Sequence, residues 1–118
     1  MYVRIKRRRI TCPGMGHAGS DSLTAVLVTS ARVDGAPRQR VVAHLAYLSG
    51  PYAHVPSRRR DFWMQVQERL APYAAELDTK ARERIARTLA AAVPQPTPAE
   101  LEAQDAALRT AFARLGKP

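Results

Sequence analysis

The first residues of the chain have the hydrophobic pattern of a β-strand. From Tyr2 onwards apolar and basic residues alternate, which is the two-residue period of a strand. Val3 and Ile5 then face one side of the strand. The other side carries three basic residues, Arg4, Lys6 and Arg8. The segment therefore predicts an edge strand with a basic outer side.

The dipeptide Asp34-Gly35 lies between two β-rich runs, residues 23–33 and 36–48. Both central residues of a type I′ turn have positive φ, so this dipeptide predicts a hairpin with a two-residue loop. Such a loop places Arg32 opposite Pro37, where the missing N–H of proline costs nothing. Continuing the register gives three further pairs: Val28–Val41, Val26–Ala43 and Thr24–Leu45. Because these residues are mainly apolar, we predict that they form the core face of the hairpin. The opposite face would carry Arg38 and Arg40 near the turn, with Leu27, Val42 and His44 at the base.

The next part of the chain has the three- and four-residue hydrophobic spacing of helices. Ser57 is a candidate N-cap for a helix from Arg58, and Pro72 is expected to kink or end it. Asp78 is a candidate N-cap for a second helix, which Pro94 ends. The two predicted apolar stripes are Phe62, Val66, Leu70 and Tyr73 in the first helix, and Ala81, Ile85, Leu89 and Val93 in the second.

A third helix is predicted after a proline-rich connector, residues 94–98. Thr97 and Glu100 have the spacing of a capping box, with Pro98 at the first helical position. Gly116 is expected to end the helix. Its apolar stripe is Leu101, Leu108, Phe112 and Leu115.

Together these elements predict an α+β fold, with an antiparallel sheet of about three strands followed by three helices. The sheet is formed by the N-terminal strand and the Asp34-Gly35 hairpin. We divide the chain into a basic α+β domain at 1–93, a connector at 94–98 and a C-terminal helix at 99–116. This helix either docks on its own domain or packs against a partner.

The positive charge of the chain lies entirely in its first half. The 118 residues contain 19 Lys and Arg against 10 Asp and Glu, a net charge of +9. Residues 1–60 hold eleven bases and two acids, whereas the last 58 residues hold eight of each. This segregation of sign indicates a polyanionic partner, and nucleic acid is the usual one.

Other classes of function find little support in the sequence. The single cysteine, Cys12, excludes an internal disulfide and fits a reducing, cytoplasmic location. No apolar run is long enough to span a membrane. The residues Gly14 to Gly19 match G-x-G-x-x-G, but a strand rather than a helix follows, which favours a plain loop. Cys12, His17, His44 and His54 lack metal-ligand spacing, and no nucleophile–base signature or carboxylate pair is evident. We therefore expect no enzyme activity, metal or cofactor.

The candidate nucleic-acid-binding residues fall into three basic clusters. Arg58 to Arg60 begin a helix, where the helix dipole disfavours cations, and their charge either contacts phosphate or is absorbed by Asp61 and solvent. Phe62 and Trp63 could stack on bases, but their helical spacing favours a core position. The complete set is Arg4, Lys6, Arg7, Arg8, Arg9, Arg32, Arg38, Arg40, Arg58, Arg59 and Arg60.

The hairpin resembles the N-terminal region of insertion-sequence transposases that have an RNase H-like catalytic domain. The matching residues are Ser30, Arg32, Asp34-Gly35, Pro37-Arg38-Gln39-Arg40 and Leu45. Short stand-alone bacterial proteins of unknown role are also similar, and they share Phe62-Trp63 and the connector Val93-Pro94-Gln95-Pro96-Thr97. The resemblance to the transposases covers residues 2–48 and implies contact with element-end DNA. Their acidic catalytic triad lies far downstream, so the resemblance implies a binding module without nuclease activity.

These observations predict a small, non-catalytic nucleic-acid-binding protein associated with a mobile genetic element, with DNA favoured over RNA. An alternative is an accessory subunit of a nucleoprotein complex, in which the basic half contacts an acidic protein or the nucleoprotein itself. In that case the C-terminal helix would mediate assembly with a protein partner or a second copy.

Overall fold

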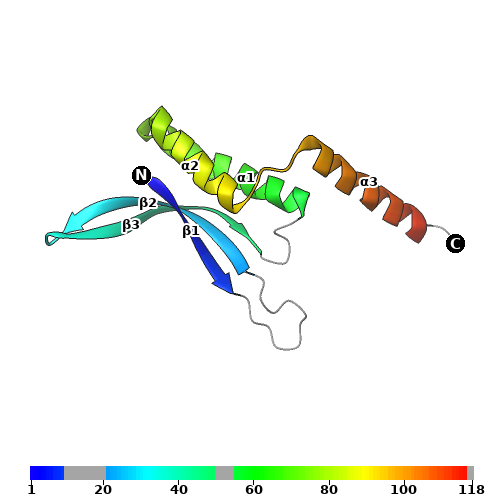
Figure 1. Cartoon of the computed structure of the whole chain (residues 1–118), viewed down its shortest axis with the longest axis horizontal. Helices are drawn as coiled ribbons and strands as arrows, with labels where there is room; N and C mark the ends of the chain where they lie inside the picture. Colours follow the sequence, from blue (N-terminus) through cyan, green and yellow to red (C-terminus); the bar gives the residue numbers. More distant parts are fainter. Residues whose placement is uncertain (10–20, 50–54, 117–118) are drawn as a thin grey trace.

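The computed structural model describes residues 1–9, 21–49 and 55–116 and has two layers, a sheet and a pair of helices (Figure 1). The sheet is antiparallel with the strand order β1-β2-β3. This confirms the predicted α+β fold. The elements in chain order are β1 (Tyr2–Arg9), β2 (Asp21–Val33), β3 (Ala36–Leu48), α1 (Pro56–Leu70), the 3₁₀ helix η2 (Ala71–Glu76), α2 (Thr79–Ala92) and α3 (Pro98–Leu115).

The turn between β2 and β3 is the predicted two-residue type I′ turn. Asp34 and Gly35 have φ values of 53° and 78°, in the left-handed region that this turn requires. Val33 lies opposite Ala36 and Arg32 opposite Pro37, as predicted, and the same register continues to the Val28–Val41 pair. The dipeptide Asp34-Gly35 therefore predicted correctly both the turn type and the strand register of the outer part of the hairpin.

Further along the hairpin the predicted register is wrong. The pairing shifts twice, between Leu27 and Val28 and between Ala25 and Val26, so that Val26 lies opposite His44 and Thr24 opposite Tyr47. The predicted pairs Val26–Ala43 and Thr24–Leu45 do not form. Each shift gives β3 one extra residue, as a β-bulge does, and a bulge bends the strand that carries it. An alternating pattern alone does not reveal such an insertion.

The predicted core face of the hairpin is also wrong. The β2 residues that belong to the main core are Leu23, Ala25 and Leu27, which alternate with the predicted ones. Their β1 neighbours Val3 and Ile5 lie on the same face, as predicted. Leu45 is the extra residue of one bulge in β3, and its side chain lies in this core. Thr24, its predicted partner, lies on the other face of the sheet.

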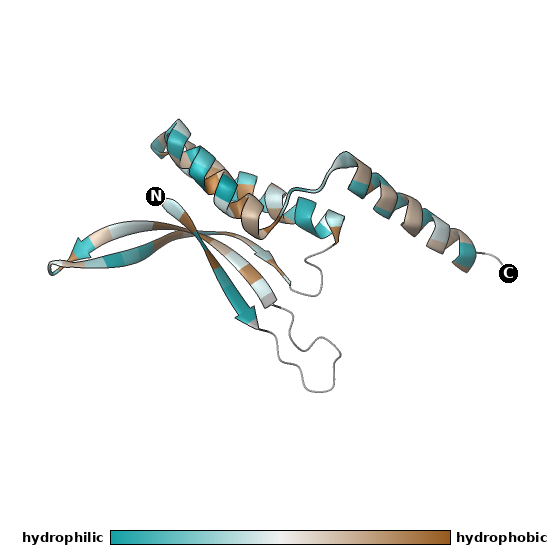
Figure 2. Cartoon of the chain, in the orientation of Figure 1, coloured by the Kyte–Doolittle hydropathy of each residue, from teal (hydrophilic) through white to brown (hydrophobic). Residues whose placement is uncertain are grey.

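Helices α1 and α2 cover this face of the sheet. α1 packs against β3 and α2 against β1, and hydrophobic residues lie along the strands where they pass beneath the helices (Figure 2). Phe62 and Trp63 belong to the core, which confirms the interpretation from helical spacing. Trp63 Nε1 donates a 2.9 Å hydrogen bond to the carbonyl of Val93, so this buried polar group has a partner. The remaining helical core residues are Val66, Ile85 and Leu89, and Leu77 and Val93 join them from the ends of η2 and α2.

Most of the predicted helix ends are confirmed, and one is not. Asp78 caps α2 by accepting a 2.7 Å hydrogen bond from the amide of Ala81, and α1 ends just before Pro72. Ser57, however, is not an N-cap. α1 begins at Pro56 after Val55, which makes no side-chain cap hydrogen bond. Gln104 of α3 provides the hydrogen-bond acceptor that an N-cap side chain would provide. Gln104 Oε1 accepts from the Ser57 amide at 2.8 Å, and its Nε2 donates to Ser57 Oγ at 2.7 Å.

The capping box that begins α3 also joins this helix to α1. Thr97 Oγ1 accepts a hydrogen bond from the Glu100 amide, and the Glu100 carboxylate accepts one from the Thr97 amide. The same carboxylate forms an ion pair with Arg59 of α1, whose side chain is only 10 % exposed. Arg59 also donates to the carbonyl of Pro94. The start of α3 is thus held against α1.

The Arg59–Glu100 ion pair should make the stability of the protein depend on pH. The hydrogen bond from Arg59, together with that from the Thr97 amide, holds the pKa of Glu100 below its ordinary value of 4.5. A carboxyl group with a lowered pKa in the folded state stabilises the fold above its unfolded pKa, and this contribution is lost as the pH falls further.

We expect Glu100→Gln to reduce stability at neutral pH, with the difference from the wild type shrinking below about pH 4.5. Urea unfolding of both proteins at a series of pH values measures this. A difference that stays constant down to about pH 3 would contradict the role of this carboxylate.

Candidate nucleic-acid interface

The β2–β3 hairpin extends beyond the sheet as a two-stranded arm, residues 29–40. β1 pairs with β2 only as far as the Tyr2–Val28 pair, so no third strand within the described residues supports the arm. Every residue from Ser30 to Arg40 is exposed. A two-stranded ribbon is marginally stable in water by itself, and this one buries almost no surface on its own domain. The arm and α3 project at opposite ends of a molecule that measures 70 × 37 × 20 Å (Figure 1).

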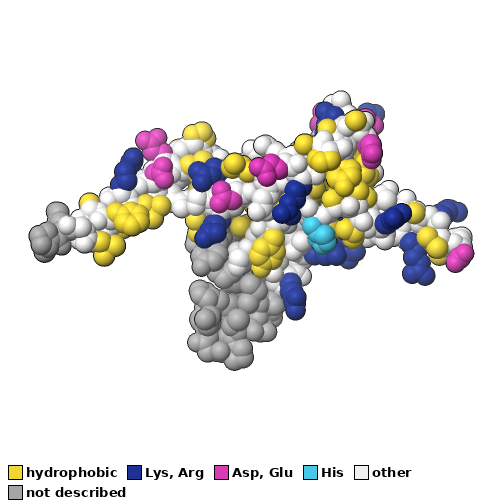
Figure 3. All heavy atoms as spheres, turned by 180° about the vertical axis from the view of Figure 1, so that it is seen from behind, with side chains coloured by type: hydrophobic (Ala, Val, Ile, Leu, Met, Phe, Trp, Pro, Cys, Tyr) yellow, Lys and Arg dark blue, Asp and Glu magenta, His cyan; other side chains and the backbone are white. Residues whose placement is uncertain are grey.

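The arm carries positive charge on both of its faces. Arg40 lies opposite Thr29 and Arg38 opposite Ala31, which places these two arginines on one face. Arg32, opposite Pro37, lies on the other face. Asp34 at the turn is the only acid in this segment. In Figure 3, Lys and Arg side chains lie along the arm at the right of the view.

The face of the sheet that the helices leave uncovered is also basic, and we call it the open face. Arg4, Lys6 and Arg8 lie opposite Val26, Thr24 and Ser22 of β2. All three basic residues are exposed, as the alternation in the sequence predicted.

Two ring-bearing residues of β3 lie on the open face: His44, which the register shifts bring there, and Tyr47. His44 shares a row with Arg4 through Val26, and Tyr47 shares a row with Lys6 through Thr24. Both rings are exposed, and Tyr47 keeps 56 % of its surface accessible. The open face therefore combines cations with aromatic rings, which is the composition of surfaces that bind nucleic acid.

A hydrogen bond connects the open face to the arm. Arg4 Nη1 donates to Gln39 Oε1 at 3.0 Å, across from β1 to the outer part of β3. The sheet arches here, with its concave side away from α1 and α2 (Figure 1), and the bulges in β3 account for the bend. Val26 and Val28, which lie on the concave side at this bend, are fully buried although they do not belong to the main core. The concave side of this bend thus runs from the β1 cations to the arm.

The start of α1 contributes to the same region. Arg58 lines a hollow of about 320 Å³ at the edge of β3, together with Tyr47, Ser49, Asp61 and Gln65. Arg60 is half-exposed and lies 3.6 Å from a carboxylate oxygen of Asp61. Arg58 therefore lies near the open face, because it shares this hollow with Tyr47. Part of the charge of Arg60 is balanced by Asp61, which was the alternative interpretation of this cluster.

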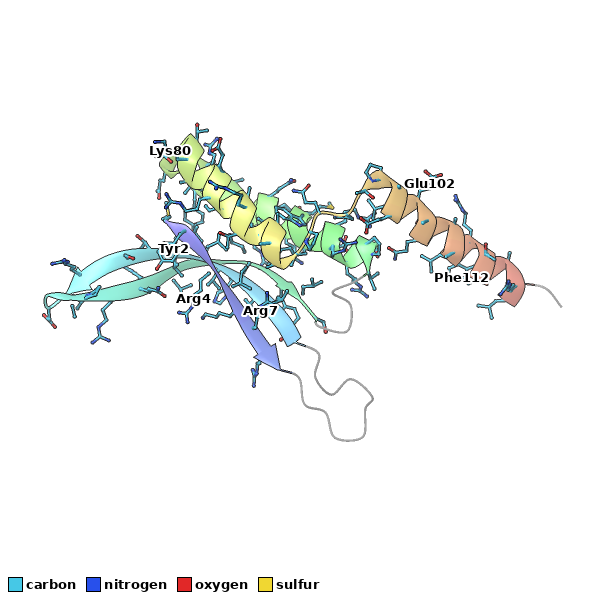
Figure 4. All side chains as sticks on the ribbon, viewed as in Figure 1. Tyr2, Arg4, Arg7, Lys80, Glu102 and Phe112 are labelled. Atoms are coloured by element: carbon cyan, nitrogen blue, oxygen red, sulfur yellow. The ribbon has the colours of Figure 1, made fainter. Side chains whose placement is uncertain are left out.

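Three of the candidate residues do not join the others. Arg59 is buried and bound to Glu100 and Pro94, so its guanidinium is committed to holding α3 and we leave it out of the interface. Arg7 lies opposite Leu23 and therefore on the face that the helices cover, although it is exposed; Figure 4 labels it beside Arg4. The side chain of Arg9 lies outside the described residues.

Sequence reasoning missed Tyr47, His44 and Gln39 as parts of this surface. In the unshifted register Tyr47 would lie on the same face as Thr24 and Val26, and that face was assigned to the core. The face on which Tyr47 lies is instead the open one, because the helices pack on the alternate residues of β2. Nothing in the amino-acid pattern distinguishes the two faces, since Val26 and Leu27 are equally apolar.

The described residues give no sign of a metal site or a membrane span. No three His, Cys, Asp or Glu side chains among them gather closely enough to hold a metal ion. Nor is any helix in the described ranges long and apolar enough to cross a membrane. Cys12, His17, His54 and the Gly14–Gly19 motif lie outside those ranges. No family model, curated protein or solved structure matches the chain.

Proposed function

We propose that this protein binds nucleic acid, with DNA as the favoured ligand, and that it does so without catalysis. The observation that carries the proposal is the basic sheet face that α1 and α2 leave uncovered, where Arg4, Lys6 and Arg8 line one edge strand. The Arg4–Gln39 hydrogen bond links this face to the arm and its three arginines. A polyanion lying along the concave side of the sheet would meet the β1 cations and Arg32, which shares that face. Arg38 and Arg40, on the opposite face of the arm, would contact a ligand that encloses the arm, as a DNA groove does.

The shape of the basic surface supports nucleic acid over an acidic protein as the ligand. A two-stranded ribbon has the dimensions to enter the DNA major groove, and the arm is such a ribbon with both faces free. The guanidinium groups on it suit phosphate oxygens, because their planar fork makes paired hydrogen bonds. Contacts of this kind position the protein on DNA, and base recognition by Arg38 or Arg40 would be an addition to them.

The resemblance of residues 2–48 to transposase N-terminal regions supports an association with a mobile element. The residues that carry it, among them Arg32 and the run Pro37 to Arg40, lie in the arm, which is the part that projects furthest from the sheet. We propose that the arm contacts the DNA ends of such an element. The single thiol of Cys12 fits action in the cytoplasm.

A salt titration tests the proposal directly. Binding to a short fluorescent duplex should weaken steeply with salt, because cations on the protein release counterions from the phosphates. If the six cations of the open face and the arm contact phosphate, log K against log salt should have a slope of about −5. Single-stranded DNA and a matching RNA are measured alongside.

The outcomes separate the parts of the proposal. Absence of binding to all three ligands at low salt would overturn nucleic-acid binding and leave an acidic protein as the partner. Tighter binding to RNA would contradict the choice of DNA. Tighter binding to single-stranded DNA would move the main contact from the arm to the open face, where Tyr47 can stack on unpaired bases.

A further inference from the structure

The last helix, α3, exposes an apolar stripe that nothing in the described chain covers. No residue of α3 is buried, and Leu108, Phe112 and Leu115 are 47 %, 68 % and 81 % exposed. Contacts with α1 hold only the first turns of α3, through Glu100 and Gln104. The rest of the helix projects away from the domain, with Phe112 near its free end (Figure 4). Isolated apolar residues on a surface are common, but three in one stripe on a projecting helix indicate a binding surface.

The stripe is symmetric about Leu108. Its apolar members are Leu101, Leu108, Phe112 and Leu115, at positions −7, 0, +4 and +7 relative to Leu108, and Gln104, whose side-chain amide is bound to Ser57 of α1, lies at −4. At about 100° per residue these positions lie on one side of the helix. A second copy of α3 that runs in the opposite direction would therefore match the stripe in register. Leu108 would meet its own counterpart on the two-fold axis, and Leu101 would meet Leu115.

The charges beside the stripe favour this antiparallel arrangement. Asp105 and Arg109 lie next to the stripe on one flank, and Ala107 and Ala111 lie on the other. In an antiparallel pair equivalent flanks meet, so Asp105 of each copy faces Arg109 of the other, and alanine faces alanine. In a parallel pair each charged flank would meet the alanine flank, and neither ion pair would form.

We propose that the protein forms a two-fold symmetric dimer through antiparallel pairing of α3, with Leu108 on the axis. The occupant of the exposed stripe is thus a second copy of the same chain. The surface is small, so the dimer should be weak and should dissociate on dilution. Formation of this dimer does not depend on nucleic-acid binding, because the interface contains no residue of the arm or the open face.

Sedimentation analysis of the full chain without nucleic acid tests the proposal. The wild type should pass from monomer to dimer between about 1 µM and 1 mM, the range expected for a small interface. Leu108→Glu places two carboxylates on the axis and should raise the dissociation constant at least about tenfold. The matched control is Thr110→Glu, on the far side of α3, which adds the same charge and should leave dimerisation unchanged.

A charge exchange tests the orientation of the helices. Asp105→Arg and Arg109→Asp should each weaken the dimer, because each sets like charges against one another. The double variant should restore it, since the opposite charges then face each other again. The variants lie on an exposed helix, and far-UV circular dichroism checks that each remains folded.

Three results would overturn the proposal. A wild type that stays monomeric at the highest concentration would exclude a second copy as the occupant of the stripe. A Leu108→Glu variant that dimerises like the wild type would place the interface elsewhere. Single charge variants that dimerise as well as the double variant would exclude antiparallel pairing.

Discussion

Replacing Phe62 by alanine is expected to lower the free energy of unfolding by about 3–5 kcal/mol, the usual cost of removing a large aromatic side chain from a core. Phe62 is 2 % exposed and packs edge-on against Trp63, with ring centroids 6.4 Å apart and an angle of 80° between the planes. The truncation removes this contact and leaves a cavity between α1 and the sheet. Urea unfolding measures the loss.

Met64 supplies the matched control for this prediction. It lies two residues further along α1 with a side chain that is 52 % exposed, so Met64→Ala should change stability by less than about 0.5 kcal/mol. If Phe62→Ala is too unstable to fold, Phe62→Leu should still fold, with a loss of about 1 kcal/mol. Equal effects of the alanine substitutions at 62 and 64 would contradict the packing of α1 against the sheet.

Removing the three arginines of the arm should weaken DNA binding by roughly two orders of magnitude or more at about 0.1 M salt. The variant is Arg32→Ala/Arg38→Ala/Arg40→Ala. Each lost phosphate contact reduces the slope of log K against log salt by about 0.9, so the slope should become shallower by almost three. All three side chains are exposed, which means that the fold should not change. Fluorescence anisotropy with a labelled duplex measures both quantities.

A variant with the same change in net charge distinguishes local contact from general attraction. Lys80, Arg84 and Arg87 lie exposed on α2, on the electrically balanced half of the chain. Their replacement by alanine should alter affinity by only a few-fold, through the weaker long-range field. If both triple variants lose affinity equally, the arm has no special role and the basic character of the whole protein is sufficient.

The local chemistry of the chain predicted its elements well. Asp34-Gly35 has a conformational requirement that few other residues meet, and the turn formed as expected. Asp78, Thr97 and Glu100 act within a single helical turn, so their capping roles follow from spacing alone. Ser57 is not a cap because α1 already begins at Pro56, and the partner of its amide, Gln104, comes from a helix 47 residues away in sequence. No local pattern reports a contact of that kind.

Only the part of the candidate interface that depends on local alternation could be predicted from the sequence. The strand period correctly placed Arg4, Lys6 and Arg8 together, because alternation is a local property. The face that the helices cover was assigned wrongly, since β2 is apolar on both sides and the two bulges in β3 cannot be inferred from spacing. Arg59 was grouped with its neighbours in sequence, but a helix turns by about 100° per residue, which directs it inward towards Glu100.

The contacts between α1 and α3 have a consequence for the order of events during protein synthesis. The Ser57 amide and the Arg59 guanidinium find their partners at Gln104 and Glu100, which are 47 and 41 residues later in the chain. A ribosome completes the sheet and α1 well before it adds these two residues. During that interval the first turn of α1 depends on water for its hydrogen bonds, and it acquires its native partners only when the start of α3 emerges and packs against it.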